Sequence, residues 1–144
     1  MKPLPHHYEV TLRGGAEGYA ALSAGGLTSL PSAPPLEFDG PGDAWSPEQL
    51  LLAAVDGCFR FTLRAVARAS QLEFIALELA SEGTVDRRDG GLSFTEIVLR
   101  PRLLIRAGTD QARALRVLEK AKKTCLVSAS LSTPIRLEPE IATA

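Results

Sequence analysis

The chain has 144 residues, of which 45% are hydrophobic and 23% are charged, the composition of an ordinary globular domain with its own core. Its 16 basic and 17 acidic side chains give a net charge of −1, so no global field favours nucleic acid or an anionic membrane as a partner. The longest apolar run, residues 50–55, is far shorter than the roughly 20 residues of a membrane span.

The N-terminal third is predicted to form short strands joined by tight turns. Residues 8–13 and 19–23 have strand character, and the pairs Gly14-Gly15 and Gly25-Gly26 follow them. Prolines at 31, 34 and 35 then predict a loop with an edge segment. Residues 1–10 lack the apolar centre of a signal peptide, and two cysteines do not make a disulfide scaffold. We therefore expect a single domain over residues 1–144, in the cytoplasm and with reduced thiols.

A long helix is predicted to begin after Ser46 and to end near Ser70. Ser46 suits the N-cap, Pro47 the first helical position, and Gln49 the reciprocal position of a capping box. The spacing of small and apolar residues predicts one inward stripe, formed by Leu51, Ala54, Val55, Cys58, Phe61, Thr62, Ala65 and Ala69. Arginines recur every fourth residue on another face, at 60, 64 and 68.

From residue 72 the apolar period changes to two, which is typical of strands. Residues 74–86 and 92–106 flank Asp89-Gly90, a strong hairpin turn signal. In the second strand one face is apolar and the other is charged, and Pro101 predicts a bulge or an edge. The apolar face has Ile97, Leu99, Leu103 and Ile105, and the charged face has Glu96, Arg100, Arg102 and Arg106.

A second helix is predicted after Thr109 or Asp110, ending near Thr124. Its inward residues are expected to be Ala114, Leu115, Val117, Leu118 and Ala121. Residues 127–134 predict a polar turn, and residues 135–141 a last strand. The order of strands, helix, hairpin, helix and strand indicates an α+β fold.

Cys58 and Cys125 each allow two interpretations, a small buried side chain or a reactive thiol. On a regular helix the neighbours of Cys58 on its own face carry no charge, and Arg60 lies about 200° around the axis. A thiol needs a cation, a base or a helix N-terminus to ionise near neutral pH. The residues next to Cys58 in the sequence supply none of these, so the local pattern favours the packing role.

Two longer segments change this balance. Residues 45–59 read W-S-P-E-Q-L-L-L-A-A-V-D-G-C-F, and residues 121–134 read A-K-K-T-C-L-V-S-A-S-L-S-T-P. The first closely resembles the signature of the OsmC/Ohr family of thiol-dependent hydroperoxide reductases, and the second is similar to the segment around that family's second cysteine. The match extends from about Tyr8 to Leu137, nearly the whole chain.

The resemblance implies a peroxidase cycle that acts on organic hydroperoxides. Cys58 would attack the peroxide as a thiolate and become a sulfenic acid, and Cys125 would resolve it as a disulfide that an external dithiol reopens. It also implies an intertwined homodimer with long cysteine-bearing helices at its centre, wrapped by antiparallel sheets, and with sites at the subunit interface. No metal and no bound organic cofactor are expected, because sulfur carries the redox chemistry.

Glu48 matches the family's functional glutamate, and we expect it to be an orienting catalytic residue. It precedes Cys58 by ten residues, which is about 15 Å along an unbroken helix. Glu48 therefore meets the sulfur of its own chain only if the helix breaks, for instance near Asp56-Gly57; otherwise it acts from the other subunit. A carboxylate in a first helical turn also has a purely structural role with the helix dipole.

One departure from the family concerns its peroxide-binding arginine. One branch of the family has that arginine in a G-G-R-x-G segment, whereas this chain has G-G-A-E-G with Ala16 at the position. Arg60, acting from the other subunit, is the candidate replacement.

Trp45, Phe59 and Phe61 either line a pocket for the organic part of the peroxide or belong to the core. The alternative function is a dimer of the same fold that binds a small apolar ligand without efficient peroxidase activity.

Overall fold

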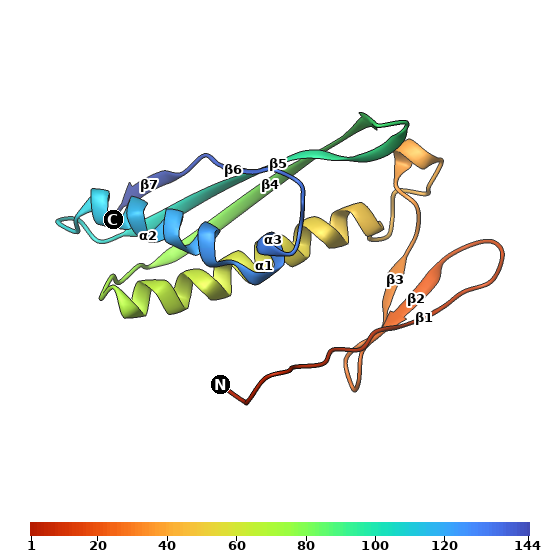
Figure 1. The fold of residues 1–144 in the computed structure, drawn as a ribbon, viewed down its shortest axis with the longest axis horizontal. Coiled ribbons are helices and arrows are strands. Elements are labelled where there is room, and N and C mark those ends of the chain that lie inside the picture. The colour runs from red at the N-terminus through yellow and green to blue at the C-terminus, as the bar shows by residue number, and fades with distance from the viewer. The chain divides into compact units, whose positions relative to one another are not determined.

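A computed structural model describes all residues, 1–144, as two compact units formed by residues 1–51 and 52–144. Each unit is described by itself. The first contains a three-stranded antiparallel sheet in the order β1-β2-β3 (Figure 1). Its strands are Thr11–Arg13, Ala20–Ser23 and Leu30–Ser32, followed by the 3-10 turn η1 at Leu36–Phe38. Short strands and turns are thus confirmed for the N-terminal third, and the single domain stays a prediction.

Helix α1 spans Pro47–Ala69, as the sequence predicts. Its capping box is formed: the Gln49 N–H donates to Ser46 Oγ at 3.2 Å, and the Ser46 N–H donates to Gln49 Oε1 at 3.0 Å. These two bonds satisfy backbone donors that the first turn of any helix leaves free. Neither α1 nor any other helix combines the length and apolar character needed to span a bilayer.

The buried face of α1 differs from the predicted stripe. The buried residues are Val55, Phe59, Leu63, Val66 and Ala67, so only Val55 of the predicted stripe is fully buried. Ala54, Phe61, Ala65 and Ala69 are exposed instead. The helix has apolar residues on more than one face, and periodicity alone does not say which face meets the sheet.

The second unit is built on a long hairpin of β4, Ala76–Arg88, and β5, Gly91–Ile105. At the predicted turn Asp89 has φ 51° and Gly90 has φ 82°. Positive φ at both central residues is the type I′ geometry, whose twist matches that of paired strands. A register shift lies at Thr84/Val85, away from the proline where a bulge was predicted.

Pro101 is buried in the middle of β5, so the prediction of a bulge or an edge at this residue is wrong. Two strands run parallel to β5 on one side: β6, Ile135–Leu137, beside residues 97–99, and β7, Glu140–Thr143, beside residues 102–105. Pro101 lies opposite the gap between them, where no partner strand needs an N–H. The predicted last strand is accordingly divided into two.

Helix α2 spans Gln111–Thr124, and the carboxylate of Asp110 accepts a hydrogen bond from the Arg113 N–H at 3.2 Å. Four of its five predicted inward residues are buried, Ala114, Val117, Leu118 and Ala121, whereas Leu115 is 39% exposed. Directly after α2, residues Leu126–Ala129 form a short helix, α3, where the sequence predicts a polar turn.

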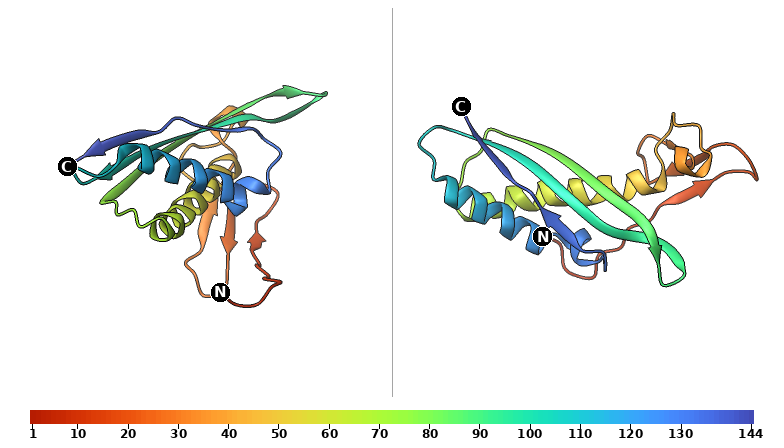
Figure 2. Two further views of the ribbon diagram at one scale, coloured as in Figure 1. Left: turned by 60° about the vertical axis from the view of Figure 1, so that its left-hand side comes forward. Right: turned by 90° about the horizontal axis from the view of Figure 1, so that it is seen from above.

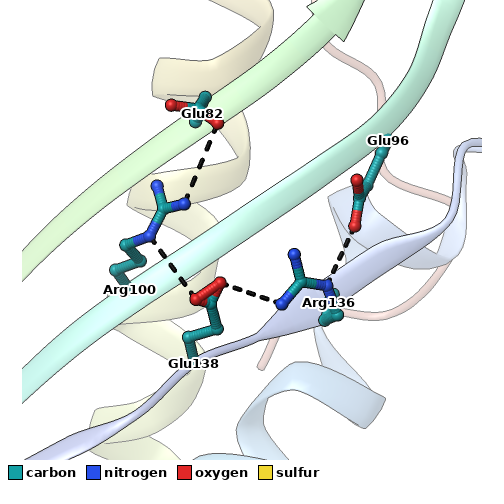
Figure 3. Close-up of polar contacts among 5 residues, drawn as sticks. All are labelled: Glu82, Glu96, Arg100, Arg136 and Glu138. Carbon is teal, nitrogen blue, oxygen red and sulfur yellow. Dashed lines mark hydrogen bonds and ion pairs between the residues drawn. The ribbon is translucent and has the colours of Figure 1, made fainter.

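Within the second unit α1 and α2 lie on the same face of the sheet of β4, β5, β6 and β7 (Figures 1 and 2). The predicted inward residues of β5 are all fully buried in the core between the sheet and these helices, namely Ile97, Leu99, Leu103 and Ile105. The other face has a chain of ion pairs, Glu82–Arg100–Glu138–Arg136–Glu96 (Figure 3). Because these side chains are exposed, each pair adds little to the stability of the fold.

We expect Asp110→Ala to lower the free energy of unfolding by about 1 kcal/mol, because the N-cap bond to the Arg113 N–H is lost. Asp110→Asn is the matched control, since an asparagine amide oxygen caps as well as a carboxylate. Urea denaturation of both variants checks the prediction, and equal losses in the two would contradict it.

Candidate functional site

The site around Cys58 is formed by residues far apart in the sequence. Cys58 lies in the middle of α1 and is half-buried, and α3 meets it from the C-terminal part of the chain. The Val127 N–H, in the first turn of α3, donates to Cys58 Sγ at 3.5 Å. On α1 itself, Thr62 Oγ1 lies 3.9 Å from the same sulfur, one helical turn away. Cys125 is the N-cap residue of α3.

These contacts decide the ionisation of Cys58. Burial by itself raises the pKa of this thiol, since the low-dielectric interior disfavours the thiolate. Hydrogen bonds from the Val127 N–H, the Cys125 side chain, the Thr62 hydroxyl and the Leu126 N–H outweigh burial, so the pKa is lowered from its ordinary value. Donors that point at a sulfur stabilise its charged form, which is the nucleophilic form.

Cys125 has the opposite tendency. Burial raises the pKa of its thiol, and the Cys58 sulfur raises it further through a hydrogen bond and through charge repulsion. The side chain and N–H of Ser128 oppose this only in part. Both cysteines are free rather than joined in a disulfide. The pair therefore favours one thiolate, at Cys58, beside one neutral thiol, at Cys125.

The sequence did not reveal what lowers the pKa of Cys58. The donors come mainly from the backbone of α3, and the residues next to Cys58 in the chain supply only Thr62. Cys125 is also fully buried, although its position after a helix favours greater exposure. A short helix whose first turn faces a sulfur is visible only once the chain is folded. The segment S-A-S at 128–130 was the one local hint of a polar environment.

Because the pKa of Cys58 is lowered, we expect its alkylation by iodoacetamide to reach half its maximal rate at a lower pH than an ordinary thiol does. Above that pH the thiolate predominates; below it the thiol is protonated and the rate falls. Thr62→Val keeps the side-chain shape and removes one donor. It should shift the profile to higher pH and slow alkylation on its acid side by roughly two- to tenfold. An unchanged profile would show that Thr62 does not act on the sulfur.

Glu48 is not brought to Cys58 within one chain. Helix α1 continues without a break through Asp56 and Gly57, so ten residues separate the two side chains by about 15 Å of helical rise. The Glu48 Oε2 atom is buried and has no hydrogen-bond partner. A buried carboxylate oxygen without a donor is costly, so a donor from outside the chain would stabilise it.

The other expected site residues lie in three different environments. Phe59 is fully buried in the core of the second unit, whereas Trp45 is 49% exposed. The Arg60 guanidinium lies 5.5 Å from the centroid of the Phe61 ring, a cation–π contact. These two residues line a groove of about 920 Å³, together with Arg64, Arg68 and Arg106. No arginine contributes to the lowered pKa of Cys58.

Comparisons with known proteins agree with this architecture. The sequence profile of the family described as "OsmC-like protein" matches residues 40–140. The chain is 29% identical to the uncharacterized protein YmaD of Bacillus subtilis (strain 168), over 94% of this chain and 93% of that one.

Solved structures show the same fold at low identity. An OsmC-like protein of unknown function from Vibrio cholerae superposes with a TM-score of 0.85 at 15% identity, over 94% of this chain and 99% of that one. An organic hydroperoxide resistance protein from Elizabethkingia anophelis superposes with a TM-score of 0.79 at 20% identity, over 100% of both chains. With the fold and the family profile in agreement, this chain belongs to the OsmC-like protein family.

Proposed function

We propose that this protein is a thiol-dependent peroxidase that reduces organic hydroperoxides to alcohols. The observation that carries the proposal is the cysteine pair: Cys58 with a lowered pKa interacts with Cys125, whose pKa is raised. A reactive nucleophile beside a second thiol is the arrangement needed for peroxide reduction followed by disulfide formation. The name of the hydroperoxide resistance protein from Elizabethkingia anophelis supports the same reaction class.

In this proposal the Cys58 thiolate attacks the distal oxygen of the peroxide, and the O–O bond breaks to release the alcohol. Cys58 is left as a sulfenic acid. Cys125 then attacks that sulfur, water is released and a disulfide forms. An external dithiol exchanges with the disulfide and restores both thiols. A cytoplasmic location is part of the proposal, because reducing compartments keep such thiols free.

A homodimer is the second part of the proposal, and the first unit supports it. Of residues 1–51 only Ser32, Ala33 and Ser46 are buried, although a three-stranded sheet needs a covered apolar face to be stable. Large apolar side chains exposed there include Tyr8, Val10, Leu12, Tyr19 and Leu27. The first unit has six acidic and two basic side chains, and residues 52–144 have 11 acidic and 14 basic ones. Opposite charges favour contact between two copies.

The proposed dimer also accounts for two side chains of α1, Phe61 and Glu48, that lack partners within the chain. Phe61 is 64% exposed on α1, and the Glu48 Oε2 atom has no donor. A second copy would cover Phe61 and supply a hydrogen-bond donor to Glu48. Arg60 of that second copy is our candidate for the peroxide-binding cation. Sedimentation velocity tests this arrangement. We expect a dimer at micromolar concentration, weakened by Phe61→Glu and unaffected by Leu92→Glu at the hairpin end, where Leu92 is 55% exposed. A monomer at all concentrations would refute it.

Consumption of tert-butyl hydroperoxide with a dithiol reductant tests the peroxidase reaction. The proposal expects turnover with an organic hydroperoxide that exceeds turnover with hydrogen peroxide, since Leu126, which directly follows Cys125, is 71% exposed and apolar. Absence of turnover with several dithiols, while both thiols stay reduced, would refute it.

One observation favours a second function, binding of a small apolar ligand without efficient peroxidase activity. Ala16 stands where a branch of the family has its arginine, and none of the arginines of this chain lowers the pKa of Cys58. The two functions are separated by Cys58→Ser. If this variant consumes peroxide like the wild type, Cys58 is not an enzyme nucleophile; if consumption is lost, the binding function loses its main support.

A further inference from the structure

We infer that the groove lined by Arg60, Arg64, Arg68 and Arg106, the arginine groove, is a docking surface for a second copy of this chain. The segment that it receives is residues 34–45 of that copy, the acidic loop. The inference rests on the proposed dimer and names the contact that orients its two copies. It starts from charge, because the lining of the groove has four arginines and one carboxylate, Glu73.

The arginines of the groove have no counter-charge within the chain. The arginines that form ion pairs are others, at positions 100, 102, 116 and 136. Arg60, Arg64 and Arg68 follow one another along α1 at intervals of four residues, so they lie on one face in steps of about 6 Å. Like charges at this spacing repel one another. A partner with negative charge would relieve the repulsion.

The groove also has apolar walls. Phe61, Phe74 and Ile75 contribute to its lining, and Phe61 and Ile75 are exposed. Its volume of about 920 Å³ is near the upper end for small-molecule sites, so it has room for several side chains. The partner that fits the groove therefore combines negative charge with large apolar side chains, which a simple inorganic anion does not.

The acidic loop has both properties. It contains no basic residue, and its acidic side chains are all exposed, namely Glu37, Asp39 and Asp43. Its large apolar side chains are exposed as well, namely Leu36, Phe38 and Trp45. No ion pair of the chain includes an acidic residue of this loop. The loop thus matches the groove in charge and in apolar character.

The shape of the acidic loop is fixed before any contact forms. At its base the Ala33 N–H donates to the Trp45 carbonyl at 3.2 Å, and the Ser32 hydroxyl donates to the same oxygen at 2.7 Å. Within the loop the Phe38 N–H donates to the Pro35 carbonyl at 3.0 Å, which closes the turn η1. A segment that is already ordered loses little conformational entropy when it binds.

A second copy supplies this contact in a balanced way. Four arginines and one glutamate give the groove a charge of +3, and three acidic residues give the loop a charge of −3. In a twofold dimer the same contact forms twice, since each copy has one groove and one loop. Complementary charges of this kind set the orientation of the two copies and disfavour other partners.

The test exchanges the charges of the groove and the loop and measures the dimer dissociation constant by sedimentation velocity. The groove variant carries Arg64→Glu and Arg68→Glu, and the loop variant carries Glu37→Lys and Asp39→Lys. Arg60 is unchanged in both, because the proposed function gives it another role. Each variant alone places like charges at both contacts of a dimer.

The matched control carries Lys120→Glu and Lys123→Glu, which reverse two exposed charges on α2. We expect the Kd of the dimer to rise at least about 100-fold in the groove variant and in the loop variant. The control should remain within about threefold of the wild type, since exposed charges outside a contact add little to affinity. Urea denaturation shows whether each variant is folded.

An equimolar mixture of the groove variant and the loop variant is the decisive sample. In a mixed dimer the reversed groove faces the reversed loop, and the native groove faces the native loop, so opposite charges meet at both contacts. We expect the mixture to dimerise about as tightly as the wild type, although each variant alone is mainly monomeric.

The outcomes separate this inference from the proposed dimer. If the groove and loop variants dimerise like the wild type, the inference is overturned, the groove serves another anionic partner, and the proposed dimer stands. If both variants are monomeric and remain so when mixed, the inference is also overturned, because the loss does not come from this pairing of charges. A wild type that is monomeric at all concentrations would remove the dimer and the inference together.

A measurement on the wild type alone covers the case in which a variant does not fold. Raising the NaCl concentration from 0.1 M to 1 M shortens the Debye length from about 10 Å to about 3 Å and should raise the Kd of the dimer about tenfold or more. A Kd that stays the same or falls would mean that apolar contacts alone hold the dimer, and would overturn the inference.

Discussion

Cys58→Ser should lower the rate of hydroperoxide consumption at least about 1,000-fold, because it removes the only ionised nucleophile of the proposed reaction. A serine hydroxyl in the same place accepts and donates the same hydrogen bonds, but it is not deprotonated near neutral pH. The four donors that lower the pKa of Cys58 cannot compensate for that difference. Steady-state consumption of tert-butyl hydroperoxide measures the effect.

Thr62→Val is the matched control for Cys58→Ser, since Thr62 lies on the same face of α1, 3.9 Å from the sulfur. It should keep most of the activity above the pKa of Cys58 and lose roughly two- to tenfold below it. The free energy of unfolding of both variants should stay close to that of the wild type. Equal activity of Cys58→Ser and wild-type proteins would remove Cys58 from the mechanism.

Leu63→Ala should lower the free energy of unfolding by about 3–5 kcal/mol, the largest stability effect that we predict. Leu63 is fully buried in the core cluster between α1 and the β4–β5 hairpin, and truncation leaves a cavity that rigid neighbours fill only in part. This would be a large fraction of the 5–15 kcal/mol that stabilises most domains. Urea denaturation measures the loss.

Leu92→Ala is the matched control for Leu63→Ala, because the same atoms are removed from a side chain that is 55% exposed at the hairpin end. We expect a loss below about 1 kcal/mol. Similar losses in the two variants would mean that α1 does not form the core described above, and that the predicted stripe through Phe61 and Ala65 is the buried face after all.

Elements with a local physical cause were predictable from the sequence. The capping box of Ser46 and Gln49 fixes the start of α1, Asp110 fixes the start of α2, and Asp89-Gly90 fixes the hairpin turn. The charged and apolar faces of β5 also follow from alternation. In each case the residues that determine the structure lie within a few positions of one another.

Features that depend on contacts between distant segments were not predictable in this way. Pro101 is tolerated in a central strand because β6 and β7 pair with β5 on either side of it. The buried face of α1 is selected by the sheet, since several faces of this helix are apolar. The same limit applies to the site, because the N–H groups of α3 that lower the pKa of Cys58 come from residues 126–127. Resemblance to a family singled out the two cysteines, and the fold shows why the pKa of Cys58 is lowered.

The most direct test of the account is a titration of free thiols, with intact mass, before and after one equivalent of tert-butyl hydroperoxide. If Cys58 and Cys125 form a working pair, each chain loses both of its thiols and about 2 Da, with no added oxygen, since disulfide formation removes two hydrogens. If both thiols persist after long incubation, the proposed peroxidase cycle is contradicted and the two cysteines serve only in packing.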